Sequence, residues 1–456
     1  MAISNITKYS FFHKTLGIIL ILLIYYIWMK FPSPIFILAI SFVPIIVYLI
    51  LKYPFFVCLS FIIFSFFRIH EAFPQLYSLH IPQMLAIASM LVLVWHMFIT
   101  KNIKVFWVDD FAYLLAFFLI VTVGVLFSSN RELAVIAWSG NFLKIVVMVI
   151  VIAWFTRTPK NFSLAIHAIV LAGIAIAFVA LINKANGIGL VEGTRVTISR
   201  DIGSVLGDPN DLSLVLLFPI SFCLALVFSV RPKVYNQAIG IFGFCIILAA
   251  IIATQSRGGL LGVVAVAGTF LYTRIRSKSL FIGISLVGVS LLFIFAGISD
   301  RSSGGASESG VDESAMGRLY AWEAAFFMAL KHPFLGVGID NFFSNYFFYS
   351  PHWDGKNHAV HSTWFGVLAE TGFLGFSIFF LLLIKTLKNI LLSGRLIAAN
   401  NAFNSYDMQG VSVMSKALLA GFFGFVVSGT FLTQGFTWPI YIIFALSIAT
   451  LRFTRS

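Results

Sequence analysis

The sequence predicts an all-α polytopic membrane protein, and three observations support this prediction. Hydrophobic residues make up 60% of the 456 residues, charged residues make up only 10%, and the mean hydropathy is +0.99. Soluble domains carry roughly 25% charged residues, so this chain leaves little room for one. The apolar residues also gather into segments close to the ~20 residues that a helix needs to cross a membrane. We expect twelve to fourteen spans.

The apolar segments follow one another along the chain, mostly with short connections. They lie near residues 15–30, 34–51, 53–67, 81–99, 110–128, 139–155, 162–183, 211–230, 237–253, 259–274, 279–297, 361–385, 412–432 and 437–451. The second and third segments are short and almost continuous through Lys52, Tyr53 and Pro54, so they suit one bent or re-entrant pair. The expected number of spans is therefore a range.

The distribution of basic residues predicts the orientation, because Lys and Arg concentrate in cytoplasmic connections. With the N-terminus inside, most of the 30 Lys and Arg residues fall on the cytoplasmic side. Both termini are then cytoplasmic, and the long hydrophilic stretch 299–360 lies on the outer side. The first apolar segment lacks an A-x-A-like cleavage site, so we interpret it as a retained helix. The chain then divides into an N-terminal bundle segment (residues 1–298), an outer loop (residues 299–360) and a C-terminal bundle segment (residues 361–456).

Several classes of function are disfavoured. The net charge of +13 suggests nucleic acid, but the basic residues are scattered between apolar segments rather than gathered on one face. Cys58, Cys223 and Cys245 lie inside apolar runs without metal-ligand spacing, so neither disulfides nor zinc are expected. Asp208 and Asp211 are one weak pair that could hold a cation, and no bound metal is expected. No Walker motif is present, and no cofactor is expected.

The outer loop 299–360 contains a low-complexity run, Ser302–Gly310, which we expect to be flexible. After it, large apolar residues at helical spacing predict an amphipathic helix that lies on the membrane or closes over a cavity. These residues are Leu319, Trp322, Phe326, Phe327 and Leu330. Asp312 or Ser314 is expected to cap the start of this helix, and His332–Pro333 to end it. Gly336 and Gly338 lack dinucleotide-loop spacing and are expected to turn the chain beneath the helix.

Four arginines, Arg195, Arg200, Arg257 and Arg318, fall on the outer side, where the charge bias disfavours them. Such placement favours an anionic ligand. Plainer interpretations remain open. Arg195 and Arg200 precede Gly207–Asp211, which also reads as an ordinary capped loop with Asp208 as the cap. Arg257 sits in the turn TQSRGG, where it also suits an arginine that reaches from the membrane to the interface.

His361 stands at the start of an outward-opening helix, three residues after His358. The positive end of the helix dipole and nearby arginines disfavour a charged imidazole there. A neutral histidine is a competent general base. The alternative is a hydrogen-bonded capping histidine, and that plain interpretation is favoured for His358. Trp322 and Trp364 are candidates for stacking on sugar rings, and both also suit ordinary packing.

Four stretches together resemble the O-antigen ligase and O-antigen polymerase superfamily of bacterial envelopes, including O-glycosylation ligases. They are GDPNDLSL, TQSRGGLLG, SAMGRLYAWEAAFFMALKHPFLGVG and AVHSTWFGVLAETGFLGF, and they cover roughly residues 190–380. The resemblance implies a GT-C-like fold of about twelve spans with a large periplasmic loop. It also implies the bacterial inner membrane as the location and membrane lipids as surroundings.

The same resemblance implies an activity: metal-independent, inverting transfer of a glycan from undecaprenyl diphosphate to an acceptor hydroxyl. The family's loop histidine corresponds to His361. Its diphosphate-binding arginines correspond to Arg257 and Arg318, with a looser correspondence for Arg200 and Arg195. Permanently charged guanidinium groups suit the growing charge of a diphosphate leaving group, and an alcohol acceptor needs a base.

The expected function is that of an O-antigen ligase with a lipid A–core acceptor. A polymerase that extends lipid-linked repeat units and a protein O-oligosaccharyltransferase share this chemistry and differ only in the acceptor. A transporter of lipid-linked glycans is a different class; it predicts charges at the membrane midplane and a repeated half. The sequence has its charges at one face and no visible repeat.

Overall fold

The structure is a computed structural model that describes residues 34–103, 105–229, 233–275, 277–295 and 313–456, with scattered positions between 17 and 29. These residues form helices joined by short turns, and the single β-bridge found among them pairs Val191 with Arg195. The all-α polytopic fold class is therefore confirmed. The flexible run predicted at Ser302–Gly310, the cap at Asp312 and most of the segment 15–30 lie outside the described residues.

The first half of the chain supplies two groups of helices. The N-terminal group comprises α2 (Pro34–Lys52), α3 (Pro54–Phe66), α4 (Pro74–Tyr77) and α5 (Ile81–Val94), with the 3-10 turn η1 (Ile69–Glu71) and the π turn η2 (Trp95–Ile99). The next comprises α6 (Asp109–Phe127), α7 (Arg131–Ala137), the π turn η3 (Trp138–Phe142), α8 (Leu143–Phe155) and α9 (Pro159–Asn186).

The second half begins with α10 (Pro209–Val227), α11 (Val234–Thr254), α12 (Arg257–Tyr272) and α13 (Lys278–Phe295). It continues with α14 (Glu313–Lys331), α15 (Phe342–Tyr349), α16 (Thr363–Ala399), α17 (Gln409–Gly429) and α18 (Trp438–Arg455). Short 3-10 turns, η4 (Arg200–Ile202), η5 (Val205–Gly207) and η7 (Asn401–Asn404), lie in the connections.

Eight helices of the described chain are long and apolar enough to cross a membrane. A ninth is added if the pair Phe42–Lys52 and Pro54–Phe66, bent by 99° at its break, counts as one span. The bend confirms the bent pair, whereas the expected twelve to fourteen spans are not reached by this measure. Two other apolar helices, Arg257–Tyr272 and Lys278–Ser290, are shorter than a full span. Helix α18 is not among the eight candidate spans; its last turn carries Arg452 and Arg455, which lower its hydropathy.

Helix α10 lies at the centre of the bundle and contacts α9, α11, α12 and α17. Its apolar segment is 83% buried, the largest share among the candidate spans of the described residues. Asp208 caps the helix as expected: its carboxylate accepts hydrogen bonds from the backbone N–H groups of Asn210, at 2.7 Å, and Asp211, at 3.3 Å. The capped and buried start of α10 therefore holds its polar side chains in defined positions.

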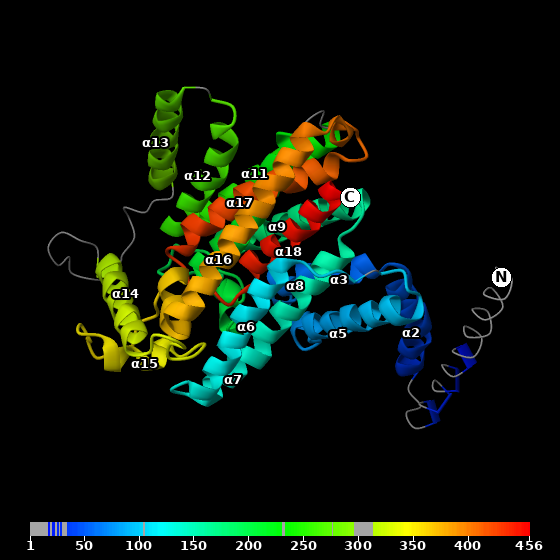
Figure 1. Cartoon of the computed structure of the whole chain (residues 1–456), viewed down its shortest axis with the longest axis horizontal. Helices are drawn as coiled ribbons and strands as arrows, with labels where there is room; N and C mark the ends of the chain where they lie inside the picture. The colour runs from blue at the N-terminus through cyan, green and yellow to red at the C-terminus, as the bar shows by residue number, and fades with distance from the viewer. Residues whose placement is uncertain are drawn as a thin grey trace.

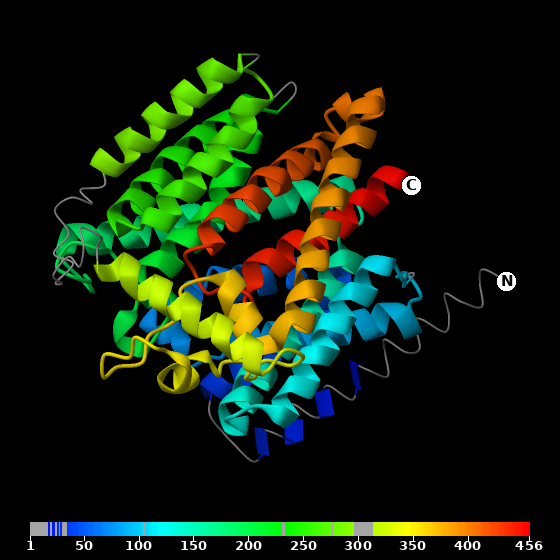
Figure 2. The same cartoon turned by 60° about the vertical axis from the view of Figure 1, so that its left-hand side comes forward.

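Helices α14 and α15 lie together at one end of the bundle, beside the first turns of α16, in both views (Figures 1 and 2). We call this the outer end, after the predicted topology. Helix α14 ends at Lys331, directly before His332–Pro333, as expected. Ser314 lies inside the helix rather than at its cap.

The face of α14 that packs against the protein is made of small side chains rather than of the predicted apolar stripe. Alanines and one methionine pack inward, in a small core separate from the main one, whereas large apolar residues of the predicted stripe stay exposed. The exposed ones are Leu319, Phe326, Phe327 and Leu330. Small side chains let α14 approach α16 closely, so the large ones are left on the outside of the bundle.

Helix α16 is broken at Gly372, whose φ of 67° lies in the left-handed region. The turn after α14 docks at this break: Phe373 N–H donates to Pro333 O at 2.8 Å, and Val337 N–H donates to Ala369 O at 2.9 Å. Gly336 and Gly338 have positive φ values and turn the chain there, as the sequence predicted. The outer segment is therefore hydrogen-bonded to the backbone of a candidate membrane-spanning helix.

Candidate functional site

The starts of α10 and α16 are tied together through the connection 430–437. Thr363 Oγ1, in the first turn of α16, donates to Leu432 O at 2.6 Å and accepts from Gln434 N–H at 3.1 Å. Gln434 Nε2 donates to Asp211 Oδ1 of α10 at 2.6 Å. Gln434 is buried, so these bonds fix the spacing between the two helix starts.

The start of α12 packs into the same region. Arg257 is its first residue, and Ser256 caps it by accepting from Gly259 N–H at 3.2 Å. A Cβ on Gly259 would collide with the Ser213 side chain of α10, and one on Gly258 would lie 3.1 Å from Phe431 Cβ. Glycine at these two positions therefore permits the close approach of α12 to α10 and to Phe431. The close contact places Arg257 at the junction of α10, α12 and the connection 430–437.

His361 lies two residues before the first residue of α16, outside the helix rather than within its first turn. Its φ of 42° is unusual for a residue with a side chain and stores backbone strain. The preceding residue is held by α14, because Trp322 Nε1 donates to Val360 O at 3.0 Å. The ring of Trp322 also stacks on Phe365 of α16, with centroids 5.1 Å apart. Helix α14 therefore fixes the turn that carries His361.

Three residues noted in the sequence, Arg318, Asp208 and His358, lie close enough to His361 to affect its pKa. Burial lowers the pKa of the imidazole below its ordinary value of 6.5, and the positive charge of Arg318 lowers this pKa further. The negative charge of Asp208 opposes both effects, and His358 lowers the pKa as well. No hydrogen bond to the His361 ring occurs among the described residues, so that part of the chain leaves both ring nitrogens without a hydrogen-bond partner.

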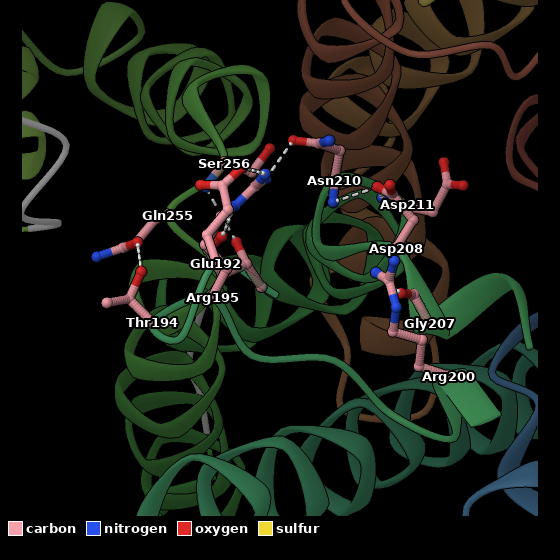
Figure 3. Close-up of polar contacts among 11 residues, drawn as sticks. Glu192, Thr194, Arg195, Arg200, Gly207, Asp208, Asn210, Asp211, Gln255 and Ser256 are labelled. Atoms are coloured by element: carbon pink, nitrogen blue, oxygen red, sulfur yellow. Dashed lines mark hydrogen bonds and ion pairs between the residues drawn. The ribbon is translucent and has the colours of Figure 1, made fainter. Parts of the chain in front are cut away.

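The Arg195 side chain joins the end of α11 to the start of α10 (Figure 3). It is only 5% exposed. Its Nε donates to Thr254 O at the end of α11, at 3.1 Å, and its Nη2 donates to Asn210 Oδ1 at the start of α10, at 2.9 Å. Glu192 lies 3.9 Å from its Nη1. A guanidinium held in this way positions the helix ends around the site.

Arg200 differs from Arg195 although both lie in the connection between α9 and α10. Arg200 is exposed, and its Nη1 donates only to Gly207 O, at 3.3 Å. Figure 3 shows its side chain beside Gly207 and Asp208, apart from the Arg195 contacts. The positive charge therefore stands next to the cap of α10, with most of its donors directed to solvent.

The two tryptophans chosen from the sequence both have packing partners. Trp322 holds Val360 and stacks on Phe365, whereas Trp364 Nε1 donates to Thr430 Oγ1 at 3.0 Å and its ring packs against the main core. Stacking on sugar rings stays a prediction for both. These contacts give each indole a role in joining elements at the outer end.

His358 lies in a more exposed setting. Its Nε2 is 3.0 Å from Asp354 Oδ2, and this hydrogen bond is the main reason that the pKa of the Asp354 carboxyl is lowered. A partner already occupies one ring nitrogen, which agrees with the plainer interpretation of His358.

No role was predicted from the sequence for two supporting residues, Gln434 and Glu370, although Glu370 lies in the same motif as His361. Gln434 joins α10 to α16 as described above. Glu370 is buried and accepts from Phe342 N–H at 3.3 Å, so it holds the start of α15 against α16. The available signal was the polar run in the short connection 430–437 for Gln434, and a carboxylate inside an apolar helix for Glu370.

Within the described ranges, no three His, Cys, Asp or Glu side chains come close enough to hold a metal ion. Asp208 accepts from two backbone N–H groups, and Asp211 accepts from Gln434. Both carboxylates thus have roles in joining and capping helices.

The helices and the polar cluster at their starts define a polytopic membrane protein with its candidate site at the outer end. Residues 242–380 match the family model described as O-Antigen ligase, and this match supports membership of the O-antigen ligase superfamily. The match includes Arg257, Arg318 and His361 and supports a membrane glycosyltransferase of the ligase or polymerase kind. No curated protein sequence matches the chain.

Proposed function

We propose that this protein transfers a glycan from undecaprenyl diphosphate to an acceptor hydroxyl, with His361 as the general base. The observation that carries the proposal is the setting of His361: it is partly buried beside Arg318 and Asp208, and its pKa is lowered by burial and by Arg318. A neutral imidazole accepts a proton at neutral pH, and a family match over the same residues supports glycosyl transfer.

The proposed reaction is a single displacement. The acceptor oxygen attacks the anomeric carbon of the glycan while its proton passes to His361. The bond between that carbon and the diphosphate oxygen breaks, and undecaprenyl diphosphate leaves with the electron pair. Direct attack inverts the anomeric centre. No proton donor is required for the leaving group, because a diphosphate is already a stable anion.

The leaving diphosphate needs fixed positive charge, and we assign this role to Arg257 and Arg318. Arg257 stands at the packed start of α12, and the charge of Arg318 acts on His361. Preorganised cations cost little reorganisation when charge develops, which is why such groups stabilise transition states. Arg200 is a further candidate, because its charge is exposed beside Asp208. Arg195, with its guanidinium committed to helix ends, contributes by positioning.

We propose the periplasmic face of the bacterial inner membrane for this site, with both termini in the cytoplasm. The basis is the excess of Lys and Arg in the other connections. The division into residues 1–298, 299–360 and 361–456 belongs to the same proposal. A reporter fused after residue 330 should be active outside the cytoplasm, and one after residue 400 inside; the reverse result would refute the orientation.

The acceptor is proposed to be a hydroxyl of lipid A–core. The test uses purified protein, an undecaprenyl-diphosphate-linked glycan and a lipid A–core acceptor, with and without EDTA. We expect glycan on the acceptor in both conditions. The His361→Ala variant serves as the inactive control. Longer lipid-linked glycans without the acceptor would identify a polymerase instead. Loss of transfer in EDTA, restored by a divalent cation, would contradict the metal-independent mechanism.

A further inference from the structure

A polar cavity lies at the outer end, apart from His361. It has a volume of about 150 Å³ and lies between α3, η1, the start of α5, η3 with α8, and the start of α18. Its walls include Ser65, Arg68, His70, Asn141 and Lys144. The lining holds two permanent or near-permanent cations and no carboxylate. A cavity of this composition suits a ligand with negative charge.

Three groups in the wall lack partners within the described residues. Ser65 and His70 are each only 7% exposed, and within the described residues Ser65 Oγ and His70 Nδ1 have no hydrogen-bond partner. Lys144 has no hydrogen bond or ion pair within those same ranges, and it stands inside a candidate membrane span. Buried donors and intramembrane cations normally have partners, so three such groups around one cavity favour a binding site for an anionic ligand.

The nearby carboxylate does not neutralise the cavity. Glu71 is buried and accepts from Arg68 Nε at 2.7 Å, and a second Arg68 nitrogen and Ser204 Oγ also contact it. Glu71 therefore offsets the charge of Arg68. The charge of Lys144 remains without a counter-charge among the described residues, and His70, 3.8 Å from Glu71, can add a donor.

The cavity is joined to the candidate active site by two hydrogen-bonded routes. Glu71 is bonded to Ser199 and Ser204, on either side of Arg200 in the connection before α10. On the other side, Asn141 Nδ2 donates to Phe436 O at 3.1 Å, in the connection that carries Gln434. Asn141 belongs to the π turn η3, a type of irregularity found often at functional sites.

We propose that this cavity is an anion-binding site that takes one phosphate or carboxylate group, held by Lys144, Ser65 and His70. The oxygens of such a group accept from the ammonium, the hydroxyl and an imidazole N–H. The group is carried either by a phospholipid headgroup or by a dissolved, sugar-borne anion. The site is defined by binding and does not depend on the transfer chemistry proposed above.

The test uses the full-length protein in phosphatidylcholine nanodiscs and measures the thermal unfolding midpoint. The probes are phosphatidic acid in the nanodisc lipid, inorganic phosphate and glucuronic acid. We expect at least one probe to raise the midpoint. In the Lys144→Gln variant its apparent affinity should fall about tenfold or more, the scale for losing one hydrogen bond to a charged group.

Ser65→Ala removes one donor with little change in volume and provides a second variant if Lys144→Gln folds poorly. Lys388→Gln, at an exposed helical position of α16, is the matched control and should bind like the wild type. Binding of phosphatidic acid alone identifies a lipid headgroup, and binding of the soluble anions identifies a dissolved source. Two results would overturn the proposal: no stabilisation of the wild type by any probe, as for a cavity that holds water only, or unchanged binding in both cavity variants.

Discussion

Arg195 and His361 are polar residues at the same end of the bundle, yet their surroundings differ. Arg195 is 5% exposed and makes bonds to Thr254 and Asn210, with Glu192 beside it. His361 is partly buried in the field of Arg318 and Asp208 and has no hydrogen bond among the described residues. Both residues are desolvated, but only Arg195 is compensated by the protein itself.

This difference distinguishes polar groups that stabilise the fold from polar groups that are candidates for function. A buried group whose donors are all directed at protein acceptors stabilises the fold and offers little to a substrate. A partly buried group with open hydrogen-bonding capacity and a shifted pKa is a candidate for chemistry. The four outer arginines look alike in the sequence, but the contacts of Arg195 and Arg200 distinguish a buried, hydrogen-bonded side chain from an exposed one.

The largest expected effect comes from replacing His361. We expect His361→Ala to lower the transfer rate by ~10²- to 10⁴-fold, the scale for losing a general base, with donor binding retained. His358→Ala is the matched control: its ring is already bonded to Asp354, so its rate should stay near that of the wild type. The measurement is in-vitro transfer at matched protein concentration. Robust transfer by His361→Ala would exclude His361 as the general base.

A smaller loss is expected at the two arginines near the site. Arg257→Ala and Arg318→Ala should each lower transfer by ~10²-fold, the scale for one preorganised donor in a transition state. Lysine at either position should restore activity only in part, because it lacks the planar fork of a guanidinium. The assay is the same transfer reaction, after verification of folding by size-exclusion chromatography. Near-normal rates in an alanine variant would remove that arginine from the proposed diphosphate site.

Arg195→Met tests the structural side of the comparison. Loss of two hydrogen bonds from a charged donor should destabilise the protein by about 1.5–3 kcal/mol for each bond, because Thr254 O and Asn210 lose their partner. The thermal midpoint should fall clearly. Arg200→Met is the control, since an exposed side chain with one bond should change stability by about 0.5 kcal/mol or less. An unchanged midpoint for Arg195→Met, together with lost transfer, would move Arg195 into the substrate site.

The smallest expected effect is on the pH dependence of transfer. The neutral form of His361 is the base, and burial and Arg318 both favour this form. Activity should therefore be full at neutral pH and be lost as the pH falls through a value below 6.5. In Arg318→Lys the charge is kept, so the acid limb should stay in place. In Arg318→Ala it should move to higher pH, measured on the residual activity; a limb that stays in place would mean that Arg318 does not act on His361.

The sequence predicted much of the fold, because long apolar segments have few alternatives to helices. The bent pair at Tyr53, the cap at Asp208 and the end of α14 at His332 followed from local chemistry. The sequence did not show which residues of α14 pack against the protein, because close packing on α16 selected the small residues Ala321, Ala324 and Ala325. In a membrane, large apolar residues are also stable on the outside.

The candidate site was predicted incompletely. Local motifs pointed to Arg257, Arg318 and His361, which lie within the matched family region. The structural role of Arg195 could not be read from the sequence, because its partners lie on α10 and α11. Gln434 was missed for the same reason: its importance depends on contacts with Asp211 and Thr363, both far away in the chain.

The break in α16 at Gly372 has a consequence for biogenesis. The outer segment, with α14 and α15, is synthesised before α16. Its docking partners, Ala369 O, Glu370 and Phe373 N–H, lie in the first turns of that later helix. The outer segment reaches its docked position only after α16 has left the ribosome and entered the membrane. We therefore expect the turn that carries His361 to form only once α16 is in place, so that shorter nascent chains lack the assembled site.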